Sequence, residues 1–235
     1  MAPKSRKAKG ERQKSEGELP LPVRWRGAGV DSGAMEARIA VFGGTFDPPH
    51  VGHLVLAECV AHQFQCDRVL FIPAGDPYRK TATDTPENRR AGVGPGRVVT
   101  PGAVRLEMVR LAIAGNPLFA ADAREVSRSG PSYTVDTLRE LHAEGHDDIV
   151  LVLGSDAVAD MPNWREPGEI RRLSRVVVAE KEPGAGTGGF ERVEMPLLRI
   201  SSTEIRARAA AGRPIRYLAP DAVRTFIEER RLYRE

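Results

Sequence analysis

The chain has 235 residues, of which 41% are hydrophobic and 29% charged, and this is ample for one sizeable α/β core. No apolar run is long enough to cross a bilayer, and no apolar segment follows the basic N-terminus, so neither a membrane span nor a secretory signal is supported and the cytoplasm is the default location. The two cysteines, Cys59 and Cys66, are interpreted as free, partly buried thiols, without a disulfide framework or the companion ligands of a zinc site.

The N-terminal 36 residues differ in composition from the rest of the chain. They are rich in charged residues, glycine and proline, show no sustained apolar period, and supply part of the formal net charge of +3. We expect residues 1–36 to form a disordered basic extension ahead of a single domain at residues 37–235. Such a tail could bind nucleic acid, but a solvated extension is the simpler interpretation, and no nucleic-acid or membrane partner is expected. Met35 is a second candidate start.

Residues 37–53, ARIAVFGGTFDPPHVGH, predict a strand, a glycine turn and the first turn of a helix. The apolar run at the start has no alternation, as expected of a strand buried on both faces of a parallel sheet. Gly43 and Gly44 allow backbone amides to approach a bound anion closely. His50 and His53 are three residues apart, so both project to one side of the helix N-terminus, where the helix dipole favours negative charge. The segment therefore indicates a site for a nucleotide phosphate.

The fold class follows from the elements after this segment. Residues 54–64 predict an amphipathic helix and residues 69–72 a second buried strand, which together with the first strand make a βαβ unit. Further apolar strands are predicted at residues 148–153 and 176–179. The expected fold is α/β, a Rossmann-like doubly wound parallel sheet in a single domain.

Other segments carry structural expectations only. Residues 81–101 predict a mobile loop, either a substrate lid or a tolerated insertion, and the helix that follows is expected to turn Arg105 and Arg110 to solvent. Residues 119–126 predict a strand or extended edge. Residues 183–189 predict a flexible glycine-rich loop, and residues 221–231 predict the last helix.

The first motif resembles the GxFxPxHxGH signature of the nucleotidyltransferase superfamily, which also includes class I aminoacyl-tRNA synthetases. Residues 50–53, HVGH, match its HxGH element. The alternative is that both histidines only cap the helix and bond to the backbone. The fixed offsets of glycines, prolines and histidines favour the nucleotide site. A class I synthetase is disfavoured by the length and by the absence of a KMSKS-like loop.

Three further segments resemble bacterial nicotinate mononucleotide adenylyltransferases. Residues 73–80, PAGDPYRK, resemble the family's PxGxPPHK stretch, with Lys80 at its lysine position but Tyr-Arg in place of Pro-His. Residues 130–141 contain an SYTxxTL stretch, and the resemblance places the nicotinate carboxylate near Tyr133 and Thr134. A solvated lysine and an ordinary helix cap by Ser132 or Thr134 are the alternatives.

The third of these segments is GSDAVADMPNW at residues 154–164, which resembles a G[AS]DxxxxxxxW stretch. Gly154 and Asp156 follow a strand and could bind a ribose hydroxyl or the water shell of a bound metal ion, or they could cap a helix. Trp164 could stack on the pyridine ring or pack in the core.

A second signature motif lies at residues 198–206, LRISSTEIR, which resembles ISSTxIR. It predicts a short strand and then a helix N-terminus that offers amides and hydroxyls to a phosphate. Capping explains the serines and Glu204, but it leaves Arg206 unexplained. By resemblance, the ATP-binding set comprises Gly43, Gly44, Thr45, Phe46, His50, His53, Gly154, Asp156, Ile200, Ser201, Ser202, Thr203 and Arg206.

The resemblance implies transfer of the adenylyl group of ATP to nicotinate mononucleotide, giving nicotinate adenine dinucleotide and pyrophosphate in NAD synthesis. His50, His53, Lys80 and Arg206 would be catalytic, and Lys80, Tyr133, Thr134 and Trp164 would bind the mononucleotide. Mg²⁺ would enter as Mg-ATP, held mostly by phosphate and water. Nicotinamide mononucleotide or phosphopantetheine as the acceptor, and a noncatalytic nucleotide sensor, remain alternatives. A homo-oligomer is compatible with the sequence.

Overall fold

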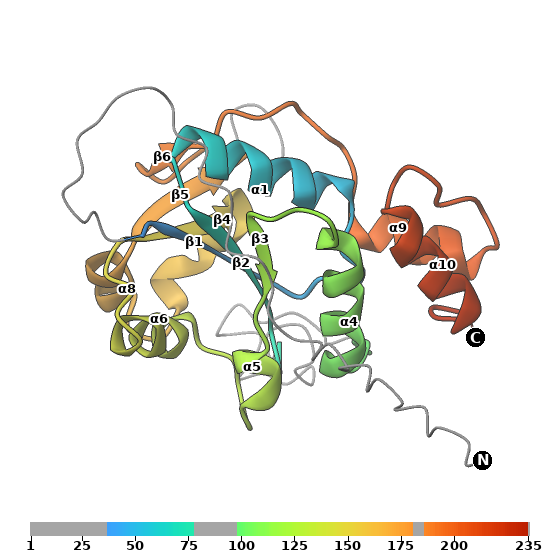
Figure 1. Cartoon of the computed structure of the whole chain (residues 1–235), viewed down its shortest axis with the longest axis horizontal. Coiled ribbons are helices and arrows are strands. Elements are labelled where there is room, and N and C mark those ends of the chain that lie inside the picture. Colours follow the sequence, from blue (N-terminus) through green and yellow to red (C-terminus); the bar gives the residue numbers. More distant parts are fainter. Residues whose placement is uncertain (1–36, 78–97, 181–185, 235) are drawn as a thin grey trace, which may run out of the picture.

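The computed structural model describes residues 37–77, 98–180 and 186–234, and in this part of the chain a parallel sheet is flanked by helices on both faces (Figure 1). The strand order is β3-β2-β1-β4-β5-β6, and every pair of neighbours is parallel. The predicted α/β, Rossmann-like doubly wound sheet is confirmed. The strands are β1 (Ile39–Gly44), β2 (Arg68–Pro73), β3 (Phe119–Ala121), β4 (Ile149–Gly154), β5 (Arg175–Ala179) and β6 (Glu191–Arg192).

Alternating side chains of the buried strands build two separate cores. In β1, Ala40 and Phe42 point into one core, whereas Ile39 and Val41 point into the other. The neighbouring strands β2, β4 and β5 divide in the same way, which explains why their sequences are continuously apolar. The predicted reading of β1 as a strand buried on both faces is therefore confirmed.

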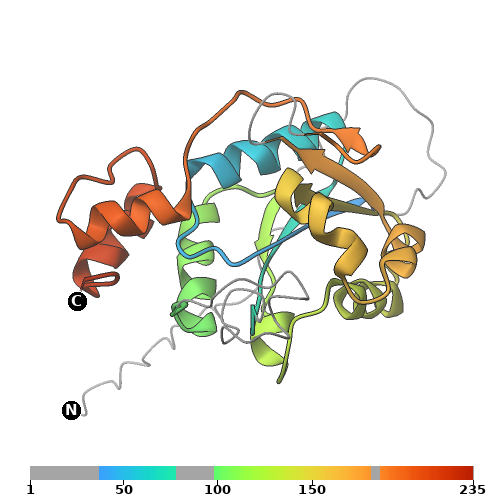
Figure 2. The ribbon, with the colours of Figure 1, turned by 180° about the vertical axis from the view of Figure 1, so that it is seen from behind.

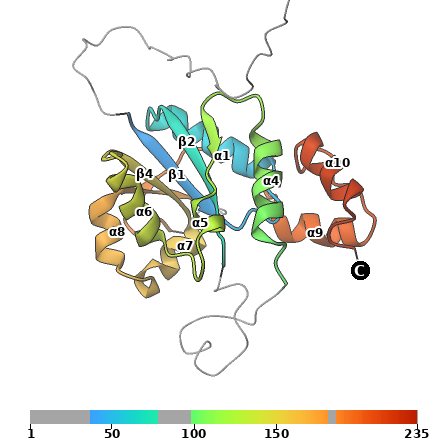
Figure 3. The ribbon, with the colours of Figure 1, turned by 60° about the horizontal axis from the view of Figure 1, so that its bottom comes forward.

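Each core is closed by its own group of helices, and Figure 3 shows the sheet between the two groups. The first core is covered by α1 (Val51–Gln63), α4 (Gly102–Ile113), α9 (Ser202–Ala210) and α10 (Asp221–Glu229). The second core is covered by α6 (Thr134–Ala143), α7 (Ser155–Asp160), η1 (Met161–Asn163) and α8 (Pro167–Leu173), while α5 (Arg124–Ser127) follows β3. None of the described helices is long and apolar enough to cross a membrane.

The chain order of the strands reverses between β1 and β4. From β1 the chain proceeds outward to β2 and β3, and it then returns to β4 on the other side of β1. Ligands of open parallel sheets bind at the carboxyl ends of the strands beside such a reversal. This places the expected site at Gly44 and Gly154, the last residues of the two central strands.

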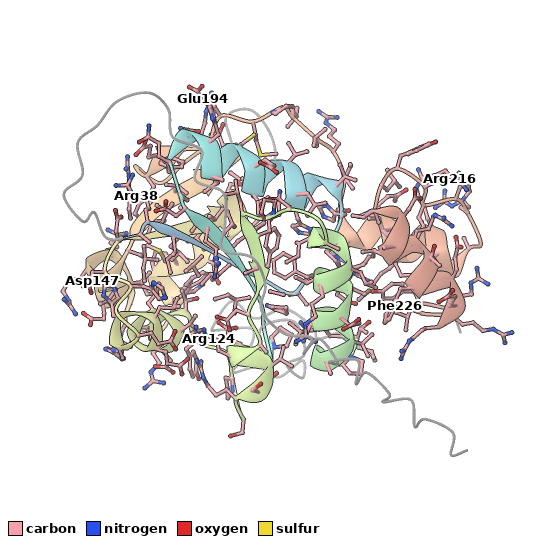
Figure 4. All side chains as sticks on the ribbon, in the orientation of Figure 1. Arg38, Arg124, Asp147, Glu194, Arg216 and Phe226 are labelled. Atoms are coloured by element: carbon pink, nitrogen blue, oxygen red, sulfur yellow. The ribbon has the colours of Figure 1, made fainter. Side chains whose placement is uncertain are left out.

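The C-terminal segment, residues 202–234 with α9 and α10, extends beyond α4 at one end of the molecule, as both faces of the ribbon show (Figures 1 and 2). Arg38, just ahead of β1, lies on the opposite side of the molecule from Arg216 and Phe226 of this segment (Figure 4). The segment contacts the loop that joins β1 to α1, where Arg206 donates to the carbonyl oxygen of Asp47 and the N–H of Val51 donates to the carbonyl oxygen of Leu218.

Several local expectations were wrong. Arg105 is not turned to solvent but is 1% exposed, because its guanidinium binds backbone carbonyl groups inside the fold. The strand expected at residues 119–126 is limited to β3, and α5 follows it. The short strand expected at the start of residues 198–206 is absent, since the chain from residue 198 to α9 has no strand, and the two-residue β6 was not predicted.

Some expectations fall on residues outside the described part of the chain. These are the disordered extension at residues 1–36, Lys80, most of the loop at residues 81–101 and the first three residues of the loop at residues 183–189. The division into an extension and a single domain stays a prediction.

Candidate active site

The paired histidines lie where β1 leads into α1. His50 is the N-cap residue of α1, and His53 is in its first turn. The two imidazole rings are stacked, with centroids 3.7 Å apart and planes inclined by 23°. The prediction that both histidines project to one side of the helix N-terminus is confirmed.

A hydrogen bond fixes the orientation and the tautomer of His53. The backbone N–H of His50 donates to Nδ1 of His53 over 3.1 Å. A neutral imidazole whose Nδ1 accepts a hydrogen bond carries its proton on Nε2. Phe42 and Phe46 pack beside the His53 ring, with centroids 5.8 and 5.1 Å away, and limit its rotation. Nε2–H is thus set as a donor for an anion.

The glycines of the first motif have different structural roles. A Cβ atom at Gly52 would lie 3.1 Å from Nδ1 of His50, so the small residue makes room for that ring. A Cβ at Gly44 would lie 3.0 Å from the Phe46 ring, whereas one at Gly43 would meet nothing within 4 Å. Gly43 therefore leaves the backbone at the end of β1 open to a ligand.

Phe46 has an internal role that the sequence did not indicate. Its side chain is 2% exposed and packs against Phe42 and Phe71, and its backbone is left-handed at a φ of 49°. The Phe46 side chain is therefore closed to a ligand, and only its main chain is left for the predicted contact with ATP. Thr45 precedes it and accepts a hydrogen bond from buried Arg105 through its carbonyl oxygen, at 2.8 Å.

The second signature motif docks directly onto the first. Ser202 Oγ donates to the carbonyl oxygen of Pro48 over 2.8 Å, and Arg206 Nη1 donates to the carbonyl oxygen of Asp47 over 2.8 Å. Ser201 caps α9 by accepting from the N–H of Glu204, as predicted. Ile200, Ser201, Ser202, Thr203 and Arg206 are thereby brought beside the loop that carries the histidines.

Gly154 and Asp156 lie on the other side of the strand reversal. Gly154 is the last residue of β4 and the N-cap of α7, and Asp156 is exposed in the first turn of that helix. Because β4 pairs directly with β1, both residues lie next to the end of β1.

Of the four predicted mononucleotide residues, Tyr133 and Thr134 form the start of α6, and Trp164 precedes Arg165, which contacts Tyr133. Tyr133 is the N-cap residue of α6, and Thr134 is its first helical residue. Trp164 follows η1 and donates from Nε1 to Asp160 Oδ2 over 3.0 Å. Both aromatic side chains are half-buried and pack against the second core. The guanidinium of Arg165 lies 5.0 Å from the centre of the Tyr133 ring.

The helix cap expected from Ser132 or Thr134 is not made, because α6 has no side-chain cap hydrogen bond. Ser132 Oγ instead accepts from the N–H of Gly75 over 2.9 Å, and the N–H of Ser132 donates to the carbonyl oxygen of Asp76. These bonds join the start of α6 to the loop after β2. Lys80 follows that loop but is outside the described residues.

Buried Glu125 stabilises the junction between the start of α6 and the loop after β2. Thr137 Oγ1 donates to Glu125 Oε1 over 2.6 Å, and burial raises the pKa of Glu125 while its hydrogen bonds with Thr137 and Ser132 lower it. Two residues of the SYTxxTL stretch, Ser132 and Thr137, thus stabilise the loop and leave Tyr133 and Thr134 at the surface of the site.

Three residues of this site were not predicted. Asp47 is 1% exposed and accepts from the phenol of Tyr233, and Arg105 joins the loop at Thr45 to the loop at residues 74–75. Within the described ranges, no group of three or more His, Cys, Asp or Glu residues could hold a metal ion. The described residues thus bring the two signature motifs together at the predicted phosphate site, with a second, aromatic-lined region beside α6.

Such a fold and site define a nucleotidyltransferase, and comparison with known proteins agrees. The model of the cytidylyltransferase-like family matches residues 41–208. A protein from Roseiflexus sp. (strain RS-1) is 44% identical over 211 residues, covering 84% of this chain and 98% of that protein. One from Streptomyces coelicolor is 41% identical over 199 residues, covering 82% and 98%. Both bear the name "Probable nicotinate-nucleotide adenylyltransferase".

Solved structures share the fold at lower identity. Plasmodium falciparum nicotinic acid mononucleotide adenylyltransferase complexed with NaAD aligns with a TM-score of 0.64 at 18% identity, over 84% of this chain and 97% of that one. The same enzyme complexed with APC gives a TM-score of 0.63 at 17% identity. The chain belongs to the cytidylyltransferase-like family and, within it, to the nicotinate-nucleotide adenylyltransferases.

Proposed function

We propose that the site transfers the adenylyl group of ATP to nicotinate mononucleotide, giving nicotinate adenine dinucleotide and pyrophosphate in NAD biosynthesis. Relatives of the same name at about 40% identity over more than four fifths of the chain support this reaction. The observation that carries the proposal is the docking of α9 onto the loop of the stacked histidines, since it joins both signature motifs at the reversal point of the sheet.

The reaction needs alignment and charge stabilisation more than proton transfer. The attacking phosphate of a mononucleotide is already anionic at neutral pH, so no general base is required. Two anionic phosphates must be held in line, and donors must stabilise the charge that develops on the α-phosphate and on departing pyrophosphate. His53 would donate to the α-phosphate from Nε2, and His50 would assist. Lys80 and Arg206 would supply positive charge.

The ATP subsite would use backbone groups more than side chains. The main chain of residues 43–46 and the N-terminus of α9 would offer amides to the phosphates, with the hydroxyl groups of Ser201 and Thr203 beside them. Ser202 would contribute its amide, because its hydroxyl donates to the carbonyl oxygen of Pro48. Gly154 and Asp156 would bind the ribose from the end of β4.

The acceptor subsite would be formed by the start of α6 and by Trp164. The N-terminus of this ten-residue helix favours a carboxylate, and Tyr133 and Thr134 are placed there. Trp164 would stack on the pyridine ring, while its bond to Asp160 holds the indole in place. Because a helix N-terminus attracts the carboxylate of the pyridine ring more than a neutral amide, this subsite would bind nicotinate mononucleotide in preference to nicotinamide mononucleotide.

The chemistry is proposed to use a divalent metal ion with ATP, Mg²⁺ in particular. The ion would enter with ATP and be bound mostly through phosphate oxygens and water. The ion would neutralise phosphate charge, and the residues of the chain would bind and orient the two nucleotides.

A pyrophosphate-release assay tests the function. The full chain is mixed with ATP, Mg²⁺ and one acceptor: nicotinate mononucleotide, nicotinamide mononucleotide or phosphopantetheine. We expect the highest kcat/KM with the nicotinate form. A strong preference for either of the other acceptors would show that nicotinate mononucleotide is not the substrate. ATP binding without pyrophosphate release would indicate a noncatalytic sensor. Size-exclusion chromatography of the same sample determines whether the chain forms a homo-oligomer.

A further inference from the structure

We propose that Tyr233 is a positioning residue for adenylyl transfer, which holds the histidine loop in place through the buried carboxylate of Asp47. The phenol O–H of Tyr233 donates to Asp47 Oδ1 over 2.8 Å. This bond joins residues 186 positions apart, one near the end of the chain and one in the first signature motif. The inference rests on the proposed reaction, and its test separates the two.

The Asp47 carboxylate is an internal anchor with its own donors. It is 1% exposed, and its second oxygen accepts from the N–H of Thr100 at 3.5 Å. A buried carboxylate is strongly disfavoured unless hydrogen-bond donors surround it. The hydrogen bond from Tyr233 therefore helps to fix the position of the Asp47 carboxylate. Burial, followed by the negative charge of Asp47, raises the pKa of Tyr233. The phenol therefore remains protonated, and a donor, throughout the neutral range.

The main chain couples the position of Asp47 to the positions of both histidines. Pro48 and Pro49 separate Asp47 from His50, and their rings restrict the backbone between the two residues. The N–H of His50 in turn orients His53 through Nδ1. A shift of Asp47 should therefore move the donor proposed to act on the α-phosphate. Displacements of about 1 Å in such a group can lower turnover about a hundredfold.

The rest of the C-terminal segment contacts the same loop. Arg206 and Ser202 bind the carbonyl groups of residues 47 and 48, and the carbonyl of Leu218 accepts from the N–H of Val51, the first helical residue of α1. Helix α10 packs on α4 next to this point. Tyr233 adds a hydrogen bond from this segment to the Asp47 side chain, and its hydroxyl also lies 3.9 Å from Met108 Sδ.

The test removes a single oxygen atom, with Y233F, and leaves the ring packing intact. Steady-state kinetics are measured with ATP and nicotinate mononucleotide at a temperature where circular dichroism shows both proteins folded. We expect kcat to fall about tenfold or more, with each KM within about twofold of wild type. A purely structural role would lower Tm and leave kcat of the folded protein unchanged. The matched control is Y217F in the same segment, because Tyr217 is 80% exposed and should retain wild-type kcat.

A double-mutant cycle tests the route through Asp47. The Asn side chain of D47N is neutral and tolerates a missing donor, so D47N/Y233F should have a kcat within about twofold of D47N alone. Independent effects that multiply would overturn the proposal, as would an unchanged kcat in Y233F or equal losses in Y233F and Y217F. An inactive wild-type chain would refute the reaction itself, whereas an active wild type with an unaffected Y233F would refute only the role of Tyr233.

Discussion

Arg105 Nη1 donates a 2.8 Å hydrogen bond to the carbonyl oxygen of Thr45 and so ties α4 to the loop of the paired histidines. The same guanidinium donates from Nη2 to the carbonyl oxygens of Ala74 at 2.6 Å and Gly75 at 3.2 Å, and from Nε to that of Thr100 at 2.7 Å. One buried cation thus sets the spacing between the loop proposed to hold ATP and the loop that leads toward the acceptor.

Replacing Arg105 should reduce both stability and turnover. R105M leaves buried carbonyl groups without this donor, and we expect a loss of about 3 kcal/mol or more in the free energy of unfolding, measured by urea denaturation. R105K keeps a charge but lacks the planar fork, so its loss should be smaller, with kcat still reduced. R110M on the exposed side of α4 serves as the control and should unfold within about 0.5 kcal/mol of wild type. Equal stability of R105M and R110M would contradict the bridging role.

The burial of Arg105 could not be predicted from the sequence. The period of α4 predicted an apolar face and placed arginines outside it, which is right for Arg110 and wrong for Arg105. Arg105 has one acceptor nearby in the chain, at Thr100, but the others, at Thr45 and at residues 74–75, are distant in sequence, and no local pattern indicates them. The bond between Asp47 and Tyr233 was missed for the same reason.

Strands and motifs were predictable because their signals are local. The apolar runs of β1, β2, β4 and β5 indicated burial on both faces, and the offsets between Gly43 and His53 indicated a phosphate turn. The two-residue β6 pairs through few backbone groups and has exposed side chains, so it carries no apolar pattern. Ser132 was predicted to cap α6, but its hydroxyl oxygen instead accepts from the backbone N–H of Gly75 in another loop.

His53 is predicted to be required for turnover. H53A should lower kcat on the order of a hundredfold or more, because it removes a donor to the charge that develops in the transition state. The fold should persist, since the ring is only partly buried. H62A, at an exposed position of the same helix, is the control and should keep wild-type kcat. If H53A and H62A turn over at similar rates, His53 has no part in the mechanism.

Trp164 is predicted to act on acceptor binding. W164A should raise KM for nicotinate mononucleotide roughly tenfold, with little change in KM for ATP, as the stacking surface for the pyridine ring is lost. W164F retains an aromatic face but loses the bond to Asp160 Oδ2, so its KM should fall between those of wild type and W164A. An unchanged KM for the mononucleotide in W164A, together with a lower Tm, would assign the indole to packing alone.

The pH dependence of stability should carry a contribution from Glu125. Burial raises the pKa of the Glu125 carboxyl in the folded state. The resulting stabilisation of the folded protein is fully present below about pH 4.3, the pKa of a glutamate in the unfolded chain, and it is lost as the pH rises through the pKa of Glu125 in the folded state. Gln at this position keeps an acceptor for Thr137 and cannot ionise. E125Q should therefore gain stability relative to wild type between pH 4 and pH 7.5 in urea denaturation. A constant difference across this range would show that Glu125 does not titrate with a raised pKa.

The last prediction concerns Gly52, the glycine between the two histidines. In G52A the new Cβ atom would lie 3.1 Å from Nδ1 and 3.2 Å from Cε1 of His50, so the ring must shift. We expect kcat to fall about tenfold, because His50 and His53 are stacked and move together. Tm should not fall correspondingly, since alanine favours a helix over glycine by roughly 0.5–1 kcal/mol.

The matched control is G168A, at the second helical position of α8 as Gly52 is in α1. A Cβ at Gly168 would meet nothing within 4 Å, so this variant gains the helix preference without a steric effect. Its kcat should equal that of wild type and its Tm should be equal or higher. Should G52A also retain wild-type kcat, the small residue at position 52 would not be needed to seat His50, and the close packing of the two rings would lose its functional meaning.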